Sequence, residues 1–317
     1  MPIPEIAGFI RRYDRFLIAG HARPDGDSLG SALALAAALE ELGKCVQVVN
    51  ADRHSRNYNT LPGIDSIKVG PKVDGDWEAL IILECNNLQR SGIDGLGHLP
   101  AVNIDHHPKN DFFAEINWVD PSAAAVGEMI YSLILELGLH PSVDVATNLY
   151  VALLTDTGSF QFSNTTADTL RIASELVKFG ANPAAIARDV LLTQPEARLR
   201  LIGRLLETLQ LDPTRKIAWI VLTREMLEAT GAEPDDIEGL VNYPLSIEGV
   251  EVCAFFKEQS VPADFRVSLR SKGRYNVGLV AEGFGGGGHK NAAGLSVAGS
   301  YETVRDRVIG ELERLLA

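Results

Sequence analysis

The chain has 317 residues, of which 46% are apolar, and it carries a formal net charge of −13 at pH 7. This length suits one large domain or two ordinary ones, and the absence of an uninterrupted apolar run of about 18 residues excludes a membrane span. Nonspecific binding of long nucleic acid is excluded as well, because it depends on neutralising many phosphates. A small anion can still bind in a local basic pocket.

The cysteines are few and widely spaced: Cys45, Cys85 and Cys253. Their odd number indicates free thiols in a reducing compartment rather than a disulfide framework. The N-terminal residues lack a charged segment followed by a long apolar stretch, so we predict no secretory signal. Together these features predict a cytoplasmic protein.

The first informative stretch joins a predicted strand at 15–21 to a predicted helix at 29–42. It contains His21, Asp25 and Asp27, and in an extended loop residues two apart point the same way, so both carboxylates can face one site. Two close carboxylates repel unless cations neutralise them, and a histidine beside them suggests that the cation is a metal. The alternative is that the aspartates and Ser28 are ordinary turn and N-cap residues.

The same arrangement recurs further along the chain. A short strand is predicted at 45–50, a near-continuous apolar strand at 78–85 ends on Glu84, and another at 101–107 ends on Asp105, His106 and His107. Helical patterns follow at 121–139 and 143–160, and the second runs into Asp156. Because the carboxyl ends of parallel strands meet at one edge of an open sheet, we expect these side chains to converge there.

The remainder of the chain predicts a second domain. An amphipathic helix at 167–180 precedes a long helical stretch at 182–211 that is interrupted at Pro195, and strands are predicted at 216–223, 250–259 and 264–272 before a closing helix at 300–317. Strands that alternate with helices throughout predict an α/β fold. We expect a larger N-terminal parallel-sheet domain at 1–185, a helical linker at 186–212 and a smaller C-terminal α/β domain at 213–317.

Two imidazoles and four carboxylates are too many for a closed structural zinc site and suit two divalent ions that share a bridging carboxylate. The mixture favours Mn²⁺, with Mg²⁺, Co²⁺ or Fe²⁺ as alternatives. The six candidate ligands are His21, Asp25, Asp27, Glu84, His106 and Asp156. We expect His107 to contact a phosphate oxygen or pass a proton to the leaving alcohol, and Asp105 to hold a histidine tautomer; the alternative is a strand-end histidine pair with no role.

A second candidate site is the glycine-rich stretch 283–294. Glycines let the backbone approach an anion closely, and residues 265–290 hold five basic residues against one acidic residue, a local charge of +4. In so acidic a chain this predicts a phosphate or carboxylate pocket. The alternatives are a flexible loop or a solvated strand edge. Arg90 lies six residues after Glu84 and is a candidate substrate clamp.

Five motifs in order along the chain resemble the DHH phosphoesterase family with its DHH-associated C-terminal domain. They are HARPDGDSLGS, the Glu84 strand, IDHH, TDTGSF and GGGGHKNAAG. The resemblance covers nearly the whole chain. It implies two α/β domains around an active-site cleft, with a di-manganese centre in the larger domain that is held by the six ligands above. It assigns the substrate's phosphate or terminal nucleotide to Arg270 and to the loop formed by Gly286, Gly287, Gly288 and His289. We also expect Ser271 and Lys272, which follow Arg270, to bind substrate.

One position departs from the family pattern, because the chain has Glu84 where the family usually has Asp. The resemblance implies a metal-dependent phosphoesterase that hydrolyses short oligoribonucleotides, 3′-phosphoadenosine 5′-phosphate (pAp), or both. Alternatives are a phosphodiesterase for cyclic dinucleotides or pApA and, from another class, a nucleotide-binding sensor with a degenerate site. The expected partners are short oligonucleotides or small nucleotides, without long nucleic acid or membrane; a homodimer is left open.

Overall fold

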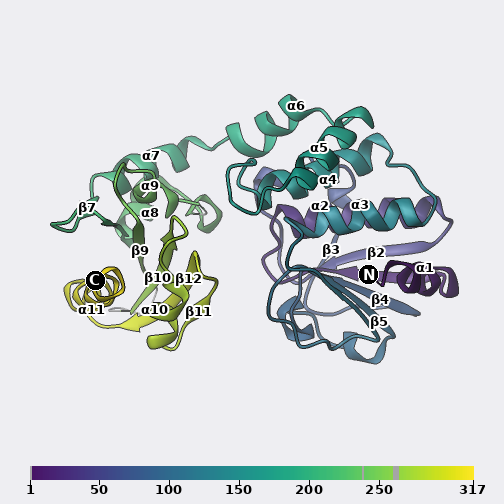
Figure 1. Ribbon diagram of the computed structural model, residues 1–317, viewed down its shortest axis with the longest axis horizontal. Coiled ribbons are helices and arrows are strands. Elements are labelled where there is room, and N and C mark those ends of the chain that lie inside the picture. Colours follow the sequence, from purple (N-terminus) through teal and green to yellow (C-terminus); the bar gives the residue numbers. More distant parts are fainter. Residues whose placement is uncertain (1, 238, 260–263) are drawn as a thin grey trace. The chain divides into compact units, whose positions relative to one another are not determined.

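The computed structural model describes residues 2–237, 239–259 and 264–317. The chain forms two compact units, the first ending at Thr193 and the second beginning at Gln194 (Figure 1). Among the described residues, no helix combines the length and the apolar character needed to cross a membrane.

The first unit is built on a six-stranded sheet with the order β3-β2-β1-β4-β5-β6, in which all neighbouring strands are parallel. Its strands are β1 (Arg15–Ala19), β2 (Cys45–Asn50), β3 (Lys68–Val69), β4 (Ala79–Leu83), β5 (Ala101–Asp105) and β6 (Ile116–Val119). The strand order reverses between β1 and β4. In open α/β sheets, ligands bind outside the carboxyl ends of the strands at such a reversal.

Helices gather on one side of this sheet (Figure 1). They are α1 (Ile3–Arg12), α2 (Gly26–Glu41), α3 (Val126–Glu136), α4 (Val143–Asp156), α5 (Ala167–Lys178) and α6 (Pro183–Ala187). Phe16, Ile81 and Ile104 are buried against them. The opposite sheet face, which includes Leu80, is buried instead under loop residues such as Leu96. The unit is therefore a parallel α/β layer, as predicted, with loops covering its second face.

The start of α2 differs from the prediction. The helix was expected to begin at residue 29, but it begins at Gly26 because Asp25 is its N-cap and accepts a 3.0 Å hydrogen bond from the Ser28 amide. Such a cap satisfies one of the amides that a helix start leaves unpaired. Asp27 therefore lies in the first helical turn, and the expectation that both aspartates project from an extended loop is wrong.

The second unit has a mixed sheet with the order β11-β12-β10-β9-β8-β7, in which β8 and β9 are parallel and the other neighbours are antiparallel. Its strands are β7 (Gln210–Leu211), β8 (Ile217–Leu222), β9 (Val252–Glu258), β10 (Asp264–Ser271), β11 (Gly287–Gly288) and β12 (Ala292–Ala298). Its helices are α7 (Glu196–Leu206), α8 (Arg224–Thr230), α9 (Asn242–Leu245), α10 (Val277–Gly283) and α11 (Tyr301–Leu316).

Each face of the second sheet has its own apolar core. Val267 and Leu269 of β10 pack with residues of α10 and α11 on one face, and Phe255 of β9 packs with Leu201 and Leu205 of α7 on the other. Helix α7 falls inside the predicted linker 186–212, and it contributes to the core of the second unit. The stretch before it contains a π-helical turn, Arg188–Leu192.

Candidate metal centre

The loop after β1 brings His21 and Asp25 together. The His21 Nδ1 atom donates a 2.9 Å hydrogen bond to the Ala22 carbonyl, which leaves Nε2 as the atom that faces Asp25, 3.5 Å from its Oδ2. Burial alone would lower the pKa of His21, but the neighbouring Asp25 carboxylate raises it above the ordinary value. An imidazole whose Nδ1 is held by a carbonyl presents Nε2 in the form that binds metals.

Asp27 is buried and accepts hydrogen bonds on both oxygens. Its Oδ2 accepts from the Val126 amide at 2.6 Å, and its Oδ1 accepts from the Gly127 amide at 3.0 Å and from the Ser31 hydroxyl at 2.8 Å. These amides open α3, whose N-cap residue Ala125 has no side-chain oxygen to offer. Asp27 therefore caps a helix that lies about a hundred residues further along the chain.

Glu84 follows β4 and is only 3% exposed. Its backbone has a φ of +60°, the left-handed region that non-glycine residues seldom adopt and that is often associated with functional sites. Burial and the charges of nearby carboxylates hold the pKa of Glu84 well above its usual range. Its buried Oε1 has no hydrogen-bond partner in the part of the chain that the structure describes, and it lies 3.2 Å from the His106 Nε2 atom. A buried carboxylate oxygen without a donor is suited to binding a cation.

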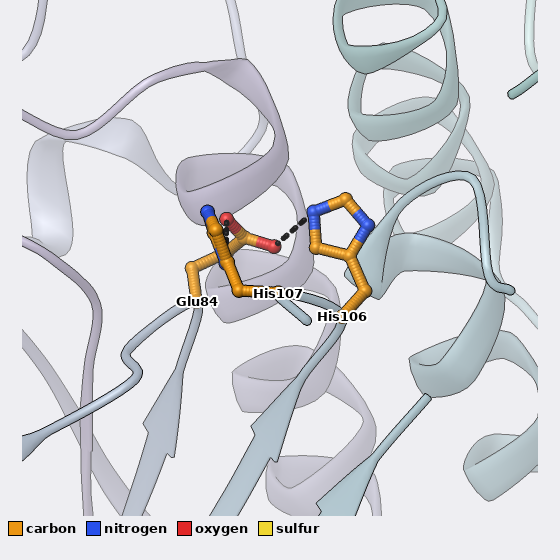
Figure 2. Close-up of side chains that lie close together, drawn as sticks. All are labelled: Glu84, His106 and His107. Atoms are coloured by element: carbon orange, nitrogen blue, oxygen red, sulfur yellow. Dashed lines mark ion pairs between the residues drawn. The ribbon is translucent and has the colours of Figure 1, made fainter. Parts of the chain in front are cut away.

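His106 and His107 follow β5, the neighbour of β4. Figure 2 shows the Glu84 carboxyl between the two imidazole rings, with ion-pair distances of 3.2 Å to His106 Nε2 and 3.9 Å to His107 Nδ1. His106 donates from Nδ1 to the Ala123 carbonyl at 3.1 Å, so its Nε2 is the atom that faces the carboxylates. That atom also lies 3.6 Å from Oδ2 of Asp156 at the end of α4.

Asp156 completes the group of acidic side chains. Burial, and next the charge of Asp27, raise the pKa of Asp156 to about 7. Burial likewise raises the pKa of Asp27. Several carboxyl groups that resist ionisation in one buried place are what a site lacking its cations should show, because cations would replace the protons.

His107 has a different environment from His106. Its Nδ1 donates to Oδ1 of the fully buried Asp105 at 2.7 Å, and Asn110 donates to the other Asp105 oxygen at 2.8 Å. The His107 Nε2 atom lies 3.4 Å from an Arg90 guanidinium nitrogen. Asp105 therefore holds the ring through Nδ1, with Nε2 facing the Arg90 guanidinium.

Two overlapping groups of side chains can each hold a metal ion with atoms that lie within 4.8 Å of one another: Glu84 with His106 and His107, and Asp27 with His106 and Asp156. Five of the predicted side chains thus converge, with His21 and Asp25 forming an adjacent pair. The first group also includes His107, which the sequence analysis assigned to phosphate contact or proton transfer. Since the His107 Nδ1 atom is already bonded to Asp105, we retain that assignment as a prediction.

Sequence reasoning missed the groups that orient these ligands. The Ala123 carbonyl accepts a hydrogen bond from His106, and the amides that open α3 donate to Asp27. Asn110 donates to Asp105, and Asn164 donates to the backbone carbonyl of Asp156. Backbone atoms leave no residue-type signal. An asparagine in a loop looks like any turn residue.

The predicted substrate residues of the second half lie around the β10–β12 pair. Arg270 is partly buried in β10, and burial lowers its pKa; its Nη1 donates to the Leu269 carbonyl at 3.0 Å. Ser271 donates to the Tyr275 carbonyl at 2.7 Å, and the Lys272 ammonium donates to the Ile247 carbonyl at 3.0 Å.

The glycine run forms a tight hairpin. Gly287 and Gly288 pair with β12, and the His289 amide donates to the Ala292 carbonyl at 2.7 Å. A Cβ atom on Gly288, whose φ is +146°, would lie 2.5 Å from the Ala292 carbonyl oxygen, and one on Gly286 would lie 2.3 Å from that of Gly294. Close backbone packing thus explains these two glycines without a ligand, so the anion-binding role of the loop stays a prediction.

Comparison with known proteins agrees with this site. The family model described as "DHH family, N-terminal domain" matches residues 15–154, and the DHHA1 domain model matches residues 218–317. The chain belongs to the DHH family of phosphoesterases.

Individual relatives cover nearly the whole chain. It is 35% identical to the bifunctional oligoribonuclease and PAP phosphatase NrnA of Thermus thermophilus, over 94% of this chain and 90% of the relative. It is 30% identical to the protein of the same name from Bacillus subtilis, over 98% and 97%. A crystal structure of an exopolyphosphatase-related protein from Bacteroides fragilis matches with a TM-score of 0.92 at 29% identity, covering 99% of this chain and 97% of that one.

Proposed function

We propose that this chain hydrolyses phosphoester bonds of short nucleotide substrates, namely short oligoribonucleotides, pAp, or both. The observation that carries the proposal is the convergence of imidazole and carboxylate groups at the carboxyl edge of the first sheet, where the strand order reverses. The names of the relatives, oligoribonuclease and PAP phosphatase, support the substrate class.

The donor set suits two divalent ions, with Mn²⁺ preferred, because it mixes imidazole nitrogen with carboxylate oxygen. We assign the six predicted ligands to them; of these, His106 belongs to both groups of closely spaced ligand atoms. Divalent ions bound here would supply Lewis-acid stabilisation of a phosphate and lower the pKa of water.

Other side chains of the first unit would handle the proton and the phosphate. Asp105 fixes the His107 ring through Nδ1, so Nε2 is the atom that can exchange a proton with the leaving alcohol or contact a phosphate oxygen. Arg90, 3.4 Å from that Nε2, adds a fixed positive charge that favours an anion in the same place.

We assign recognition of the non-reacting part of the substrate to residues 213–317, with 186–212 as the connection. One face of β10 carries Arg266, Ser268 and Arg270, because these residues occupy every second position of the strand. Their register partners on β12 are Ser296, Gly294 and Ala292. The small residues on β12 leave room for the flat base of a nucleotide, and the two guanidinium groups supply positive charge for its phosphate.

A panel of pAp, pApA, cyclic dinucleotides and oligoribonucleotides of two to ten residues, assayed with Mn²⁺ and with EDTA, tests the proposal. We expect Mn²⁺-dependent release of phosphate from pAp or of mononucleotides from the shortest oligomers. Turnover confined to pApA or cyclic dinucleotides would favour the phosphodiesterase alternative. Tight binding of these nucleotides without turnover under any metal would favour the sensor alternative.

A further inference from the structure

Residues 123–127 lead from the loop after β6 into the first turn of α3. Their backbone atoms form hydrogen bonds with side chains from two distant parts of the chain. The Ala123 carbonyl accepts from His106 Nδ1 at 3.1 Å. The two amides that open α3 donate to Asp27 at 2.6 and 3.0 Å. Residues 123–127 make all of these contacts through backbone atoms. The position of this backbone therefore determines how the side chains of His106 and Asp27 are oriented.

Asn164 connects this segment to a third candidate ligand. Its Nδ2 atom donates to the Ala124 carbonyl at 3.0 Å and to the Asp156 carbonyl at 3.1 Å. Asp156 is the last residue of α4, where helix carbonyls lack partners within the helix. One side-chain amide therefore uses both of its hydrogens to tie the end of α4 to the segment that orients His106 and Asp27.

The orientation of this amide is determined by its neighbours. Turning it over would place Oδ1 against two carbonyl oxygens, which have no hydrogen to donate to it and would repel it at that distance. In the observed orientation Oδ1 is buried and has no hydrogen-bond partner among the described residues. The side chain thus gives up a bond on its oxygen and keeps both bonds to the ligand-bearing segments.

The three ligands that these contacts connect are the three members of one metal-binding group: Asp27, His106 and Asp156 have ligand atoms within 4.8 Å of one another. We propose that Asn164 is a positioning residue that holds this group in the geometry for cation binding. Two carboxylates and an imidazole would otherwise spread apart, because the carboxylates repel each other without a cation. Outer contacts of this kind typically change metal affinity by about 10- to 100-fold.

This inference rests on the proposal that the cluster binds a divalent cation, and it is independent of which nucleotide is hydrolysed. Asn117 offers a matched control. It is also a partly buried asparagine of the first unit that bonds to two backbone groups, accepting from the Ala114 amide at 3.2 Å and donating to the Ala114 carbonyl at 2.7 Å. Neither contact lies on a segment that carries a candidate ligand.

The test is calorimetric titration of Mn²⁺ into the metal-free full chain, with thermal unfolding measured on the same samples. We expect Asn164→Ala to weaken Mn²⁺ affinity by about 10- to 100-fold and Asn117→Ala to leave it within about twofold, even if both variants lose similar thermal stability. Saturating Mn²⁺ should bring the turnover of Asn164→Ala back toward the wild-type value, which a defect of the fold alone would not allow.

Asn164→Ser keeps one donor and should show an affinity between those of the wild type and Asn164→Ala; if the alanine variant does not fold, the comparison is made with Asn117→Ser. Wild-type affinity in Asn164→Ala, or an equal loss in the Asn117 control, would overturn the positioning role. A wild-type chain that binds no Mn²⁺ would instead overturn the cation site, and the positioning role with it.

Discussion

The metal-free protein should become less stable as the pH rises from 5 to 7, and Asp156 allows the size of the effect to be worked out. In the folded chain the pKa of Asp156 is raised to about 7, whereas in an unfolded chain an aspartate titrates near about 3.9. Between these values the folded chain keeps a proton that the unfolded chain has released. The free energy of unfolding therefore falls with rising pH, by about 1.4 kcal/mol per pH unit at first and by less near pH 7, where the folded chain also releases its proton. The total is about 2.3 kcal/mol from pH 5 to 7.

Four other groups of the site act in the same direction, whereas the pKa values of Asp25 and Asp105 are lowered, so their opposite contribution changes below this pH range. The pKa values of Glu84 and Asp27 are raised, mainly by burial, so protonation of these carboxyls also favours the folded state at low pH. The pKa values of His21 and His106 are raised above the ordinary value, against the effect of burial, by neighbouring carboxylates. Their contribution is present below the unfolded pKa and is lost as the pH rises through the folded one.

Urea unfolding in EDTA at pH 5, 6 and 7, followed by circular dichroism, measures this slope. The wild type should lose about 2.3 kcal/mol or more over the range, and Asp156→Asn should lose about 2 kcal/mol less because the amide binds no proton. Mn²⁺ at pH 7 should restore the lost stability, since cations take the place of the protons. Metal-free stability that stays flat or rises from pH 5 to 7, or an unchanged slope in Asp156→Asn, would refute the reasoning.

Substitutions at three further residues have defined outcomes. Glu84→Gln should lose more than about 100-fold in turnover, beyond the range of outer contacts, while Glu84→Asp should keep a substantial part; normal phosphate release by Glu84→Gln would show that this carboxylate is not a ligand. Arg270→Ala should reduce kcat/KM for pAp or dinucleotides by about 10- to 150-fold, since a charge-assisted contact contributes about 1.5–3 kcal/mol. A small generic phosphodiester should be hydrolysed almost equally by both enzymes, and an equal loss on it would move Arg270 out of substrate recognition. Asp27→Ala should lower the free energy of unfolding by about 1–3 kcal/mol relative to Asp27→Asn in EDTA, because the buried amides of α3 lose their acceptor; equal stability of the two variants would contradict the capping role.

The convergence of Glu84 with the two histidines could be predicted from the sequence because these residues follow the ends of neighbouring strands. Glu84 and His106 each follow an apolar run, and parallel strands place their carboxyl ends at one edge of a sheet. The predicted two-domain α/β fold is confirmed. It could be predicted because apolar runs, glycine stops and helical periodicity are local signals in the sequence.

The orientation of the ligands could not be predicted, because it depends on contacts between residues far apart in the chain. Asp27 was expected in an extended loop, but Asp25 caps α2 and places Asp27 in the first turn. Its carboxylate then bonds to amides of α3. No property of the sequence near residue 27 indicates which helix will lie there.

The glycine run shows that one sequence pattern can have two different structural causes. Four consecutive glycines favoured an anion-binding loop, yet Gly286 and Gly288 are required by the close approach of β12 in the hairpin. A glycine is compatible with both a nearby ligand and a nearby backbone. Only tertiary structure separates the two, and here it supplies a sufficient reason without a ligand.

The central claim is that the carboxylate and imidazole cluster of the first unit is a divalent-cation site for phosphoester hydrolysis. Titrating Mn²⁺ into the metal-free enzyme while phosphate release from pAp and mononucleotide release from a dinucleotide are followed tests it most directly. Turnover of at least one substrate should rise from zero to saturation with Mn²⁺, and Asp156→Asn should need far more Mn²⁺ or stay inactive. Full turnover in EDTA, or an Asp156→Asn titration that matches the wild type, would contradict the claim.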